Sequence, residues 1–201
     1  MSLILQIIAY TGIFVFALTG ALKARNHQMD IFGAAVLAFV TAYGGGTVRD
    51  VLIGVRPVSW MNDYVALVLV LLAVVVVFLL HRNVARFKIT IFLSDAIGLG
   101  LFTVLGIHKS LEMGVNYGYA IIMGAITATF GGFLADILSN TVPDLLKRSE
   151  LYATACLVGG LVQVLLMRAG VPEHLNLCIC IVLVVGIRVI SKWKRIYLPQ
   201  I

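Results

Sequence analysis

Long apolar runs alternate with short polar connections along the whole chain. Seven of these runs approach the roughly 20 residues that a helix needs to cross a bilayer. They cover residues 3–22, 31–55, 64–81, 90–108, 117–141, 150–168 and 174–191. The pattern predicts an all-α polytopic membrane protein, with one membrane domain over residues 1–201 and seven transmembrane helices.

Composition supports a bilayer protein and excludes an ordinary soluble domain. The chain is 61% hydrophobic and only 12% charged, and its mean hydropathy is +1.06. A soluble domain has about half apolar and about a quarter charged residues. The first apolar run lacks the basic start and the cleavage site of a signal peptide, so it is expected to be the first transmembrane helix.

Basic residues are distributed unevenly between alternate connections. One set of connections and the C-terminal tail carry ten: Lys23, Arg25, Arg82, Arg86, Lys88, Lys147, Arg148, Lys192, Lys194 and Arg195. The other set carries three: Arg56, Lys109 and Arg168. Loops rich in lysine and arginine stay in the cytoplasm. We therefore expect a protein of the cell (inner) membrane with its N-terminus outside and its C-terminus inside, whose partner is the bilayer and not nucleic acid.

The sequence matches itself when it is shifted by 86 residues. Over residues 12–57 and 98–143, 12 of 46 positions are identical. Identical pairs include Gly12 and Gly98, Phe16 and Phe102, Gly20 and Gly106, Lys23 and Lys109, and Pro57 and Pro143. Two repeats of three spans each (about residues 3–81 and 90–168) must cross the membrane in opposite senses, with a seventh helix at about 174–191 outside them. Inverted repeats are typical of transporters and channels.

Glycine clusters interrupt the second and fifth runs at matching positions. The first reads YGGGTVRD over residues 43–50, and the second reads GGFLAD over residues 131–136. Each glycine costs about 1 kcal/mol against alanine inside a helix, so we expect helices 2 and 5 to kink or open there. Freed carbonyl groups would replace part of a cation's hydration shell. The alternative is that the glycines let neighbouring helices approach closely.

The predicted pore residues follow from these clusters. They are Gly44, Gly45, Gly46, Gly131 and Gly132, with the hydroxyl groups of Thr41, Thr47, Thr127 and Thr129 as candidate ligands. For the threonines, the alternative is a hydrogen bond to their own helix backbone.

Two aspartates follow the clusters in the same register. Asp50 stands four residues after Gly46, and Asp136 stands four residues after Gly132. A charge exposed to lipid costs at least about 2.5–3.5 kcal/mol, so intramembrane carboxylates are candidate functional groups. They are expected to attract cations. The alternative is that they are structural carboxylates, which bridge to Arg49 or Lys109 or cap backbone groups freed by the kinks.

Three further charges are candidates for gating. Arg49 has Ala135 as its repeat partner, so it breaks the symmetry, and it could pair with Asp50, Asp136 or Asp95. Lys109, at the outer end of the fourth span, is a second movable cation. For Asp95 an interfacial or capping role is an equal alternative.

Motifs for chemistry are missing from the sequence. The three cysteines lie in apolar runs, and the four histidines have no metal-ligand spacing. There is no nucleophile elbow, zinc-binding helix motif or phosphate loop. We expect no enzyme activity, no catalytic residues, no metal site and no cofactor.

The two glycine runs, set in seven spans with an inverted repeat, resemble the prokaryotic trimeric intracellular cation (TRIC) channels. Bacterial sequences of this type are also labelled glycine-transporter-domain proteins. The resemblance implies a homotrimer in which each protomer has an hourglass pore between kinked helices 2 and 5. It would pass K⁺ or Na⁺, chiefly K⁺, and is compatible with a bound lipid. The competing hypotheses are a secondary transporter of a small zwitterion such as glycine, and a scaffold.

Overall fold

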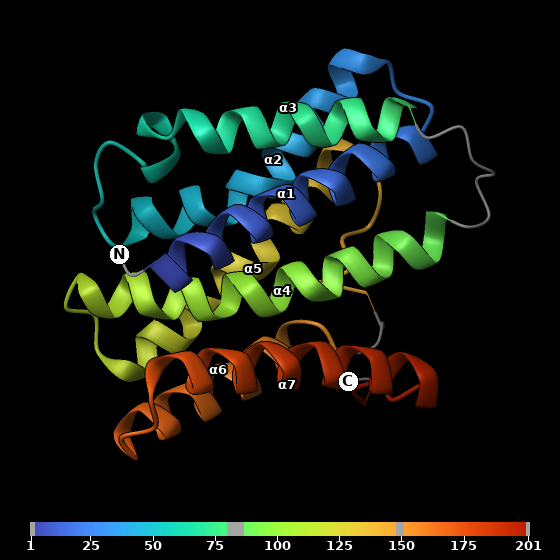
Figure 1. Cartoon of the computed structure of the whole chain (residues 1–201). Helices are drawn as coiled ribbons and strands as arrows, with labels where there is room; N and C mark the ends of the chain where they lie inside the picture. Colours follow the sequence, from blue (N-terminus) through green and yellow to red (C-terminus); the bar gives the residue numbers. More distant parts are fainter. Residues whose placement is uncertain (1–2, 80–86, 148–150, 200–201) are drawn as a thin grey trace.

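The chain folds into seven α-helices, as the apolar pattern predicts. The computed structural model describes residues 3–79, 87–147 and 151–199. The helices are α1 (Leu3–Asn26), α2 (Ile31–Leu52), α3 (Tyr64–Leu79), α4 (Phe87–Glu112), α5 (Tyr117–Leu138), α6 (Ala153–Arg168) and α7 (Glu173–Lys194), with a short 3₁₀ helix η1 (Ser59–Asn62) before α3 (Figure 1). Five are long and apolar enough to cross a membrane, while α3 and α6 have 16 residues each. The prediction of an all-α membrane fold is confirmed.

The repeat is visible in how the helices begin and end. Asp30 caps α2 by accepting a hydrogen bond from the backbone N–H of Gly33 at 2.7 Å. Its repeat partner Asn116 caps α5 in the same way, accepting from Tyr119 at 3.1 Å. Backbone φ is positive at two further repeat pairs: Gln28 and Gly114, and Gly54 and Asn140. The 86-residue register therefore governs the loops as well as the apolar runs.

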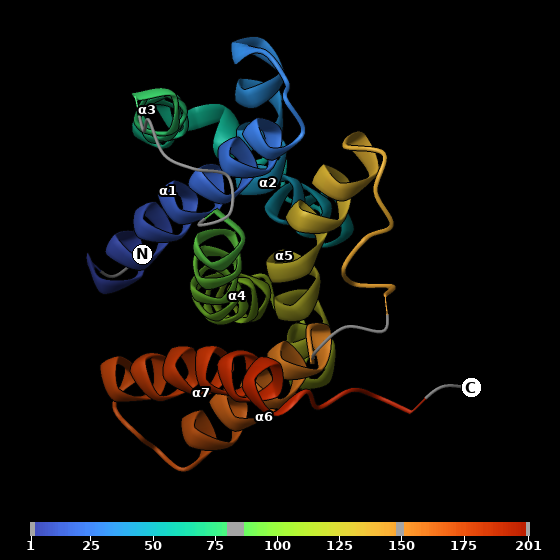
Figure 2. The ribbon, with the colours of Figure 1, turned by 90° about the vertical axis from the view of Figure 1, so that its right-hand side faces the viewer.

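Matched helices of the two repeats face each other at the centre. Helix α2 packs on α5, and α1 packs on α4. Helix α3 covers α1 and α2 on one side, while α6 and α7 cover α5 and α4 on the other (Figures 1 and 2). Exposed apolar side chains cover α3 and include Leu67, Leu71, Val75 and Phe78. Such a surface suits lipid rather than water.

Both glycine clusters lie within continuous α-helix. The expectation that the helix backbone opens there is wrong, while a bend within the helix stays a prediction. A Cβ on Gly45 would collide with the carbonyl of Thr127, and a Cβ on Gly131 would collide with the carbonyl of Thr41. These two glycines therefore let the α2 and α5 backbones touch, which is the alternative role weighed above.

Part of the charge pattern cannot be placed. Arg82, Arg86 and Arg148 lie outside the described residues, as do the predicted ends of the third span (80–81) and the start of the sixth (150). Below, "inner" means the end of the bundle that carries Lys23, which the charge pattern predicts to face the cytoplasm. "Outer" means the end that carries Asp63.

Candidate functional site

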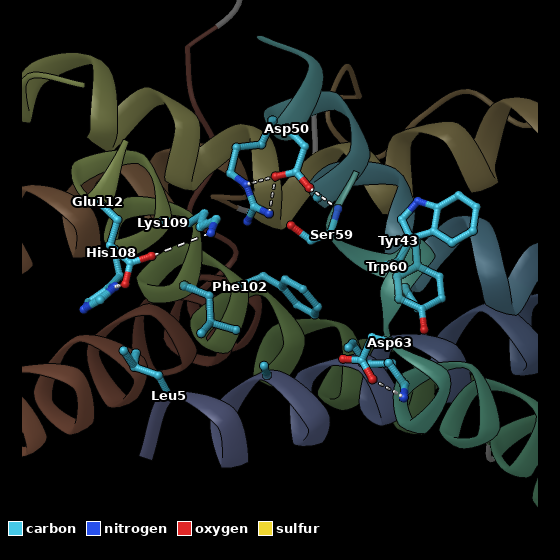
Figure 3. A pocket seen from close by; sticks show the side chains of 17 residues that line it. Leu5, Tyr43, Asp50, Ser59, Trp60, Asp63, Phe102, His108, Lys109 and Glu112 are labelled. Atoms are coloured by element: carbon cyan, nitrogen blue, oxygen red, sulfur yellow. Dashed lines mark hydrogen bonds and ion pairs between the residues drawn. The ribbon is translucent and has the colours of Figure 1, made fainter. Parts of the chain in front are cut away.

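A cavity of about 260 Å³ opens between α1, α2, α4 and the segment around η1. We term it the outer cavity. Figure 3 shows Asp50 and Ser59 above it, His108, Lys109 and Glu112 to one side, and Tyr43, Trp60 and Asp63 to the other. Phe102 lies in the middle. The outer cavity therefore borders on α1, α2 and α4, while at Gly45 and Gly131 the α2 and α5 backbones are in direct contact.

Asp50 is the most deeply buried charge of the outer cavity, with 1% of its surface exposed. Its Oδ1 accepts hydrogen bonds from Arg49 Nη2 at 2.7 Å and Nε at 3.0 Å. Its Oδ2 accepts from the backbone N–H of Ser59 at 2.8 Å. Arg49 thus neutralises Asp50, which is one of the three pairings considered for Arg49 from the sequence. Through its bond to Ser59, Asp50 also fixes the loop that follows α2.

Lys109 lies on the rim of the outer cavity and not in an ion pair with either aspartate. Its Nζ is 3.8 Å from Glu112. His108 lies between two carboxylates, 3.4 Å from Glu112 and 3.3 Å from Glu173 of α7. Lys109 is more than a third exposed, so this arrangement is loosely held.

Aromatic side chains form the opposite wall of the outer cavity. Trp60 donates its indole N–H to Thr47 Oγ1 at 3.0 Å, and its ring packs against Phe39 and Tyr43. Tyr43 is buried, and its hydroxyl has no hydrogen-bond partner among the described residues. A buried polar atom without a partner is costly, so this hydroxyl is available to bind a water molecule.

A second cavity of about 200 Å³ lies at the inner end, and we term it the inner cavity. Its charged lining residues are Lys23, Lys88, Asp95, Asp144, Arg188 and Lys192. It is the counterpart of the outer cavity under the 86-residue shift. Ile91, Asp95 and Lys23 of the inner cavity are the repeat partners of Leu5, Ala9 and Lys109 of the outer cavity.

Asp136, the repeat partner of Asp50, lies beside the inner cavity. It accepts a hydrogen bond from Lys23 Nζ at 2.8 Å and another from the backbone N–H of Asp144 at 3.0 Å. Both aspartates therefore hold the loop that follows their helix and both are neutralised by a cation. Neither Arg49 nor Lys109, the partners considered from the sequence, is the partner of Asp136.

Asp95 completes the inner site by joining three elements. It accepts from the Tyr152 hydroxyl at 3.3 Å and lies 3.5 Å from Arg188 Nη2 of α7. The Arg188 guanidinium stacks on Tyr152 and on Phe92, with centroid distances of 4.7 and 5.0 Å. Asp95 is a buried salt-bridge residue, not an interfacial one.

The predicted pore residues divide into two groups. Gly46 lines the outer cavity, and the nearest atom to a Cβ on Gly132 would be the Tyr152 hydroxyl near Asp95. Gly44, Gly45 and Gly131 lie in the contact between α2 and α5. The four threonine hydroxyls each donate to a carbonyl four residues earlier: Thr41, Thr47, Thr127 and Thr129. None of these threonines lines the outer or the inner cavity.

Sequence reasoning missed several residues of the two cavities. Lys23, Arg188 and Tyr152 supply the partners at the inner end, and Asp63 and Glu112 supply acidic groups at the outer end. For Lys23 a signal existed, since it matches Lys109 in the repeat. Within the described residues, no three His, Cys, Asp or Glu side chains gather in a way that would hold a metal ion.

Comparison with known proteins places the chain among bacterial membrane proteins. A family model described as "Glycine transporter" matches residues 6–82 and again residues 92–168, and the second match begins 86 residues after the first. A UPF0126 membrane protein of Vibrio cholerae is 41% identical over 168 residues, covering 83% of this chain and 70% of that protein. The inner membrane protein YadS of Escherichia coli is 40% identical over 153 residues, covering 76% and 73%.

Solved structures give the same result in three dimensions. A TRIC trimeric intracellular cation channel orthologue from Rhodobacter sphaeroides superposes with a TM-score of 0.90 at 35% identity, covering 97% of this chain and all of that one. The likeness extends over the helices that build both cavities.

Proposed function

The chain belongs to the family described as "Glycine transporter", and from this premise we propose that it is a monovalent cation channel. The proposal extends to a homotrimer with one pathway in each protomer and to K⁺ as the chief permeant ion. It includes an inner-membrane location, as for the E. coli relative, with the N-terminus outside. The TRIC orthologue of the same fold supports the channel and the trimer.

The observation that carries the proposal is the pair of repeat-related cavities at opposite ends of the α1–α4 contact. Each borders a buried aspartate at the same repeat position, Asp50 outside and Asp136 inside. A cation that crosses the bilayer needs polar oxygens at both depths, because the hydrocarbon offers none. Two cavities arranged in series meet this need, whereas a scaffold protein would gain nothing from them.

Gating at the outer end follows from the repeat. Lys23 pairs with Asp136, so the symmetry-equivalent pairing would join Lys109 to Asp50. Arg49 holds Asp50 instead, and Lys109 remains on the rim. We infer that Lys109 and Arg49 compete for Asp50, and that the exchange changes how much positive charge faces the path. A movement of Lys109 across the field would make this exchange voltage-dependent.

Planar-bilayer recording of the purified protein tests the channel. Unitary K⁺ currents of picoampere size are expected in symmetric K⁺ solutions, with smaller permeability to anions. A carrier turns over orders of magnitude too slowly to give such steps. Absence of unitary currents in several lipid mixtures and voltages would contradict the channel.

A second function is favoured by one specific observation, the description of the family model as a glycine transporter. The outer cavity offers both charges that a zwitterion requires, in Arg49 and Asp50, within about 260 Å³. Saturable counterflow of labelled glycine into proteoliposomes, without unitary currents, would support this carrier over the channel.

A further inference from the structure

Two phenylalanines stack at the centre of the molecule. The rings of Phe16 in α1 and Phe102 in α4 lie 4.9 Å apart with an interplanar angle of 4°. They are repeat partners, and 1% and 7% of their surfaces are exposed. Two equivalent residues that stack on each other lie on the axis that relates the two repeats. The pair therefore marks the midpoint between the two cavities.

Helical spacing places this pair between the cavities along both helices. On α1, Ala9 and Ile13 line the outer cavity, Phe16 follows, and Lys23 lines the inner cavity two turns later. On α4 the order is reversed, from Asp95 of the inner cavity to Phe102, whose ring forms part of the wall of the outer cavity. Residues three or four apart share one helix face. The two cavities and the aromatic pair thus form a single line.

Each ring rests in a gap left by a glycine of the other helix. A Cβ on Gly98 of α4 would collide with the ring of Phe16, and a Cβ on Gly12 of α1 would lie 2.9 Å from the ring of Phe102. Gly12 and Gly98 are also repeat partners. The two glycines therefore allow the rings to lie flat across the α1–α4 contact, where any larger side chain would displace them.

We propose that the Phe16–Phe102 pair is the constriction that closes the pathway between the outer and inner cavities, and that conduction requires the rings to leave their glycine gaps. This inference rests on the proposed channel function. The rings are surrounded by apolar residues of the main core, among them Ile13, Leu99 and Leu105. Hydrophobic constrictions stop ions because water leaves them and a cation cannot pass without its hydration shell. Ring displacement would widen and wet this point, so the size and polarity of residues 16 and 102 set the resting conductance.

Graded substitution at Phe102 is the first test. Potassium efflux from proteoliposomes and open probability in planar bilayers are measured for wild type, Phe102→Leu, Phe102→Ala, Phe102→Ser and the double variant Phe16→Ala/Phe102→Ala. We expect resting flux to rise in the order leucine, alanine, serine, and to exceed wild type about tenfold in the double variant. Phe130→Ala is the matched control, because Phe130 also contacts a neighbouring phenylalanine ring, that of Phe133, but lines neither cavity. Only variants that keep the wild-type elution volume and a cooperative melt are compared.

Cysteine labelling gives a readout that does not depend on current. In a Cys178→Ser background, which removes the exposed native thiol, Ile13→Cys in the wall of the outer cavity keeps both rings and should react with a membrane-impermeant, positively charged thiol reagent from the outer side only. Ile91→Cys in the wall of the inner cavity should react from the inner side only.

The outcomes separate this proposal from the channel proposal. If wild type conducts and the folded Phe102 and double variants keep its resting flux, the constriction is overturned while the channel stands. Equal labelling of Ile13→Cys from both sides would also overturn it. If wild type and every variant lack unitary currents, the channel proposal fails, and the constriction fails with it.

Discussion

The outer and inner ends are built on the same repeat but held together differently. At the outer end, the buried pair joins Arg49 to Asp50, two consecutive residues of one helix. At the inner end, Lys23 of α1 reaches Asp136 of α5, and Arg188 of α7 reaches Asp95 of α4. The inner pairs therefore connect different helices, whereas the outer pair connects none. Rearranging the outer pair therefore breaks no contact between helices, whereas loss of an inner pair removes one.

The two cavities also differ in the balance of acidic and basic residues that line them. Three acidic residues, Asp50, Asp63 and Glu112, line the outer cavity beside Arg49 and Lys109. The inner cavity has four basic residues, Lys23, Lys88, Arg188 and Lys192, beside Asp95 and Asp144. A cation therefore meets a more favourable field at the outer end. Under the proposed channel function, the outer end would select and gate ions, while the ion pairs of the inner end join helices of the bundle.

The largest expected effect distinguishes two lysines that are repeat partners. Lys23→Met leaves the Asp136 carboxylate buried without its cation, and breaking a buried pair from one side costs about 3–5 kcal/mol. Lys109→Met removes only an exposed pair, worth less than about 1 kcal/mol. Thermal unfolding in detergent measures both, and equal shifts in melting temperature would contradict the difference between the two ends.

Alanine at Gly46 and at its repeat partner Gly132 should also distinguish the two ends. At Gly132 a Cβ would lie 2.9 Å from the Tyr152 hydroxyl, and such overpacking costs roughly 1–3 kcal/mol. At Gly46 the nearest atom is the Arg49 guanidinium at 3.8 Å, so alanine fits and gains up to about 1 kcal/mol of helix propensity. Melting temperatures of Gly132→Ala and Gly46→Ala should move in opposite directions. A loss of stability at Gly46 would show that the outer end is as tightly packed as the inner.

The Asp50 charge is expected to matter for conduction. Asp50→Asn leaves Arg49 as a net positive charge at the outer cavity, so K⁺ conductance should fall about fivefold at low ionic strength. The difference should shrink in 1 M KCl, where the screening length is about 3 Å. Single-channel conductance across a salt series measures this. A reduction that is the same at every salt concentration would indicate a structural role for Asp50 instead.

The smallest expected effect concerns the rim. Glu112→Gln removes the 3.8 Å partner of Lys109 and frees that lysine to approach Asp50. Since an exposed pair contributes only about 0.2–1 kcal/mol, the open probability of Glu112→Gln should shift by roughly twofold. In the double variant Lys109→Gln/Glu112→Gln, the second substitution should cause no further shift. Voltage-step recordings of the single and double variants test this. An equal shift in the double variant would exclude Lys109 from gating.

Much of the architecture could be predicted because it depends on local rules. Apolar runs of spanning length gave the seven helices, and the 86-residue register gave the inverted repeat, down to the matched caps at Asp30 and Asn116. The charges inside spans stand out in the sequence, because few charges are placed at such cost without a partner. These features depend on composition and spacing, which the chain carries by itself.

Only the tertiary structure decided which groups meet. The glycines of the two clusters look equivalent in the sequence, yet Gly45 and Gly131 hold α2 against α5, while Gly46 lines the outer cavity and Gly132 faces the Tyr152 hydroxyl. Likewise Asp136 forms an ion pair with Lys23, which is 113 residues away in the sequence, and not with Arg49 of the first cluster. Pairing depends on how helices rotate about their axes and cross, and this is set by packing over the whole bundle. The sequence determined where the charges and glycines lie along each helix. The fold determined which of them meet, and so produced the two cavities, the ion pairs at each end and the Phe16–Phe102 stack between them.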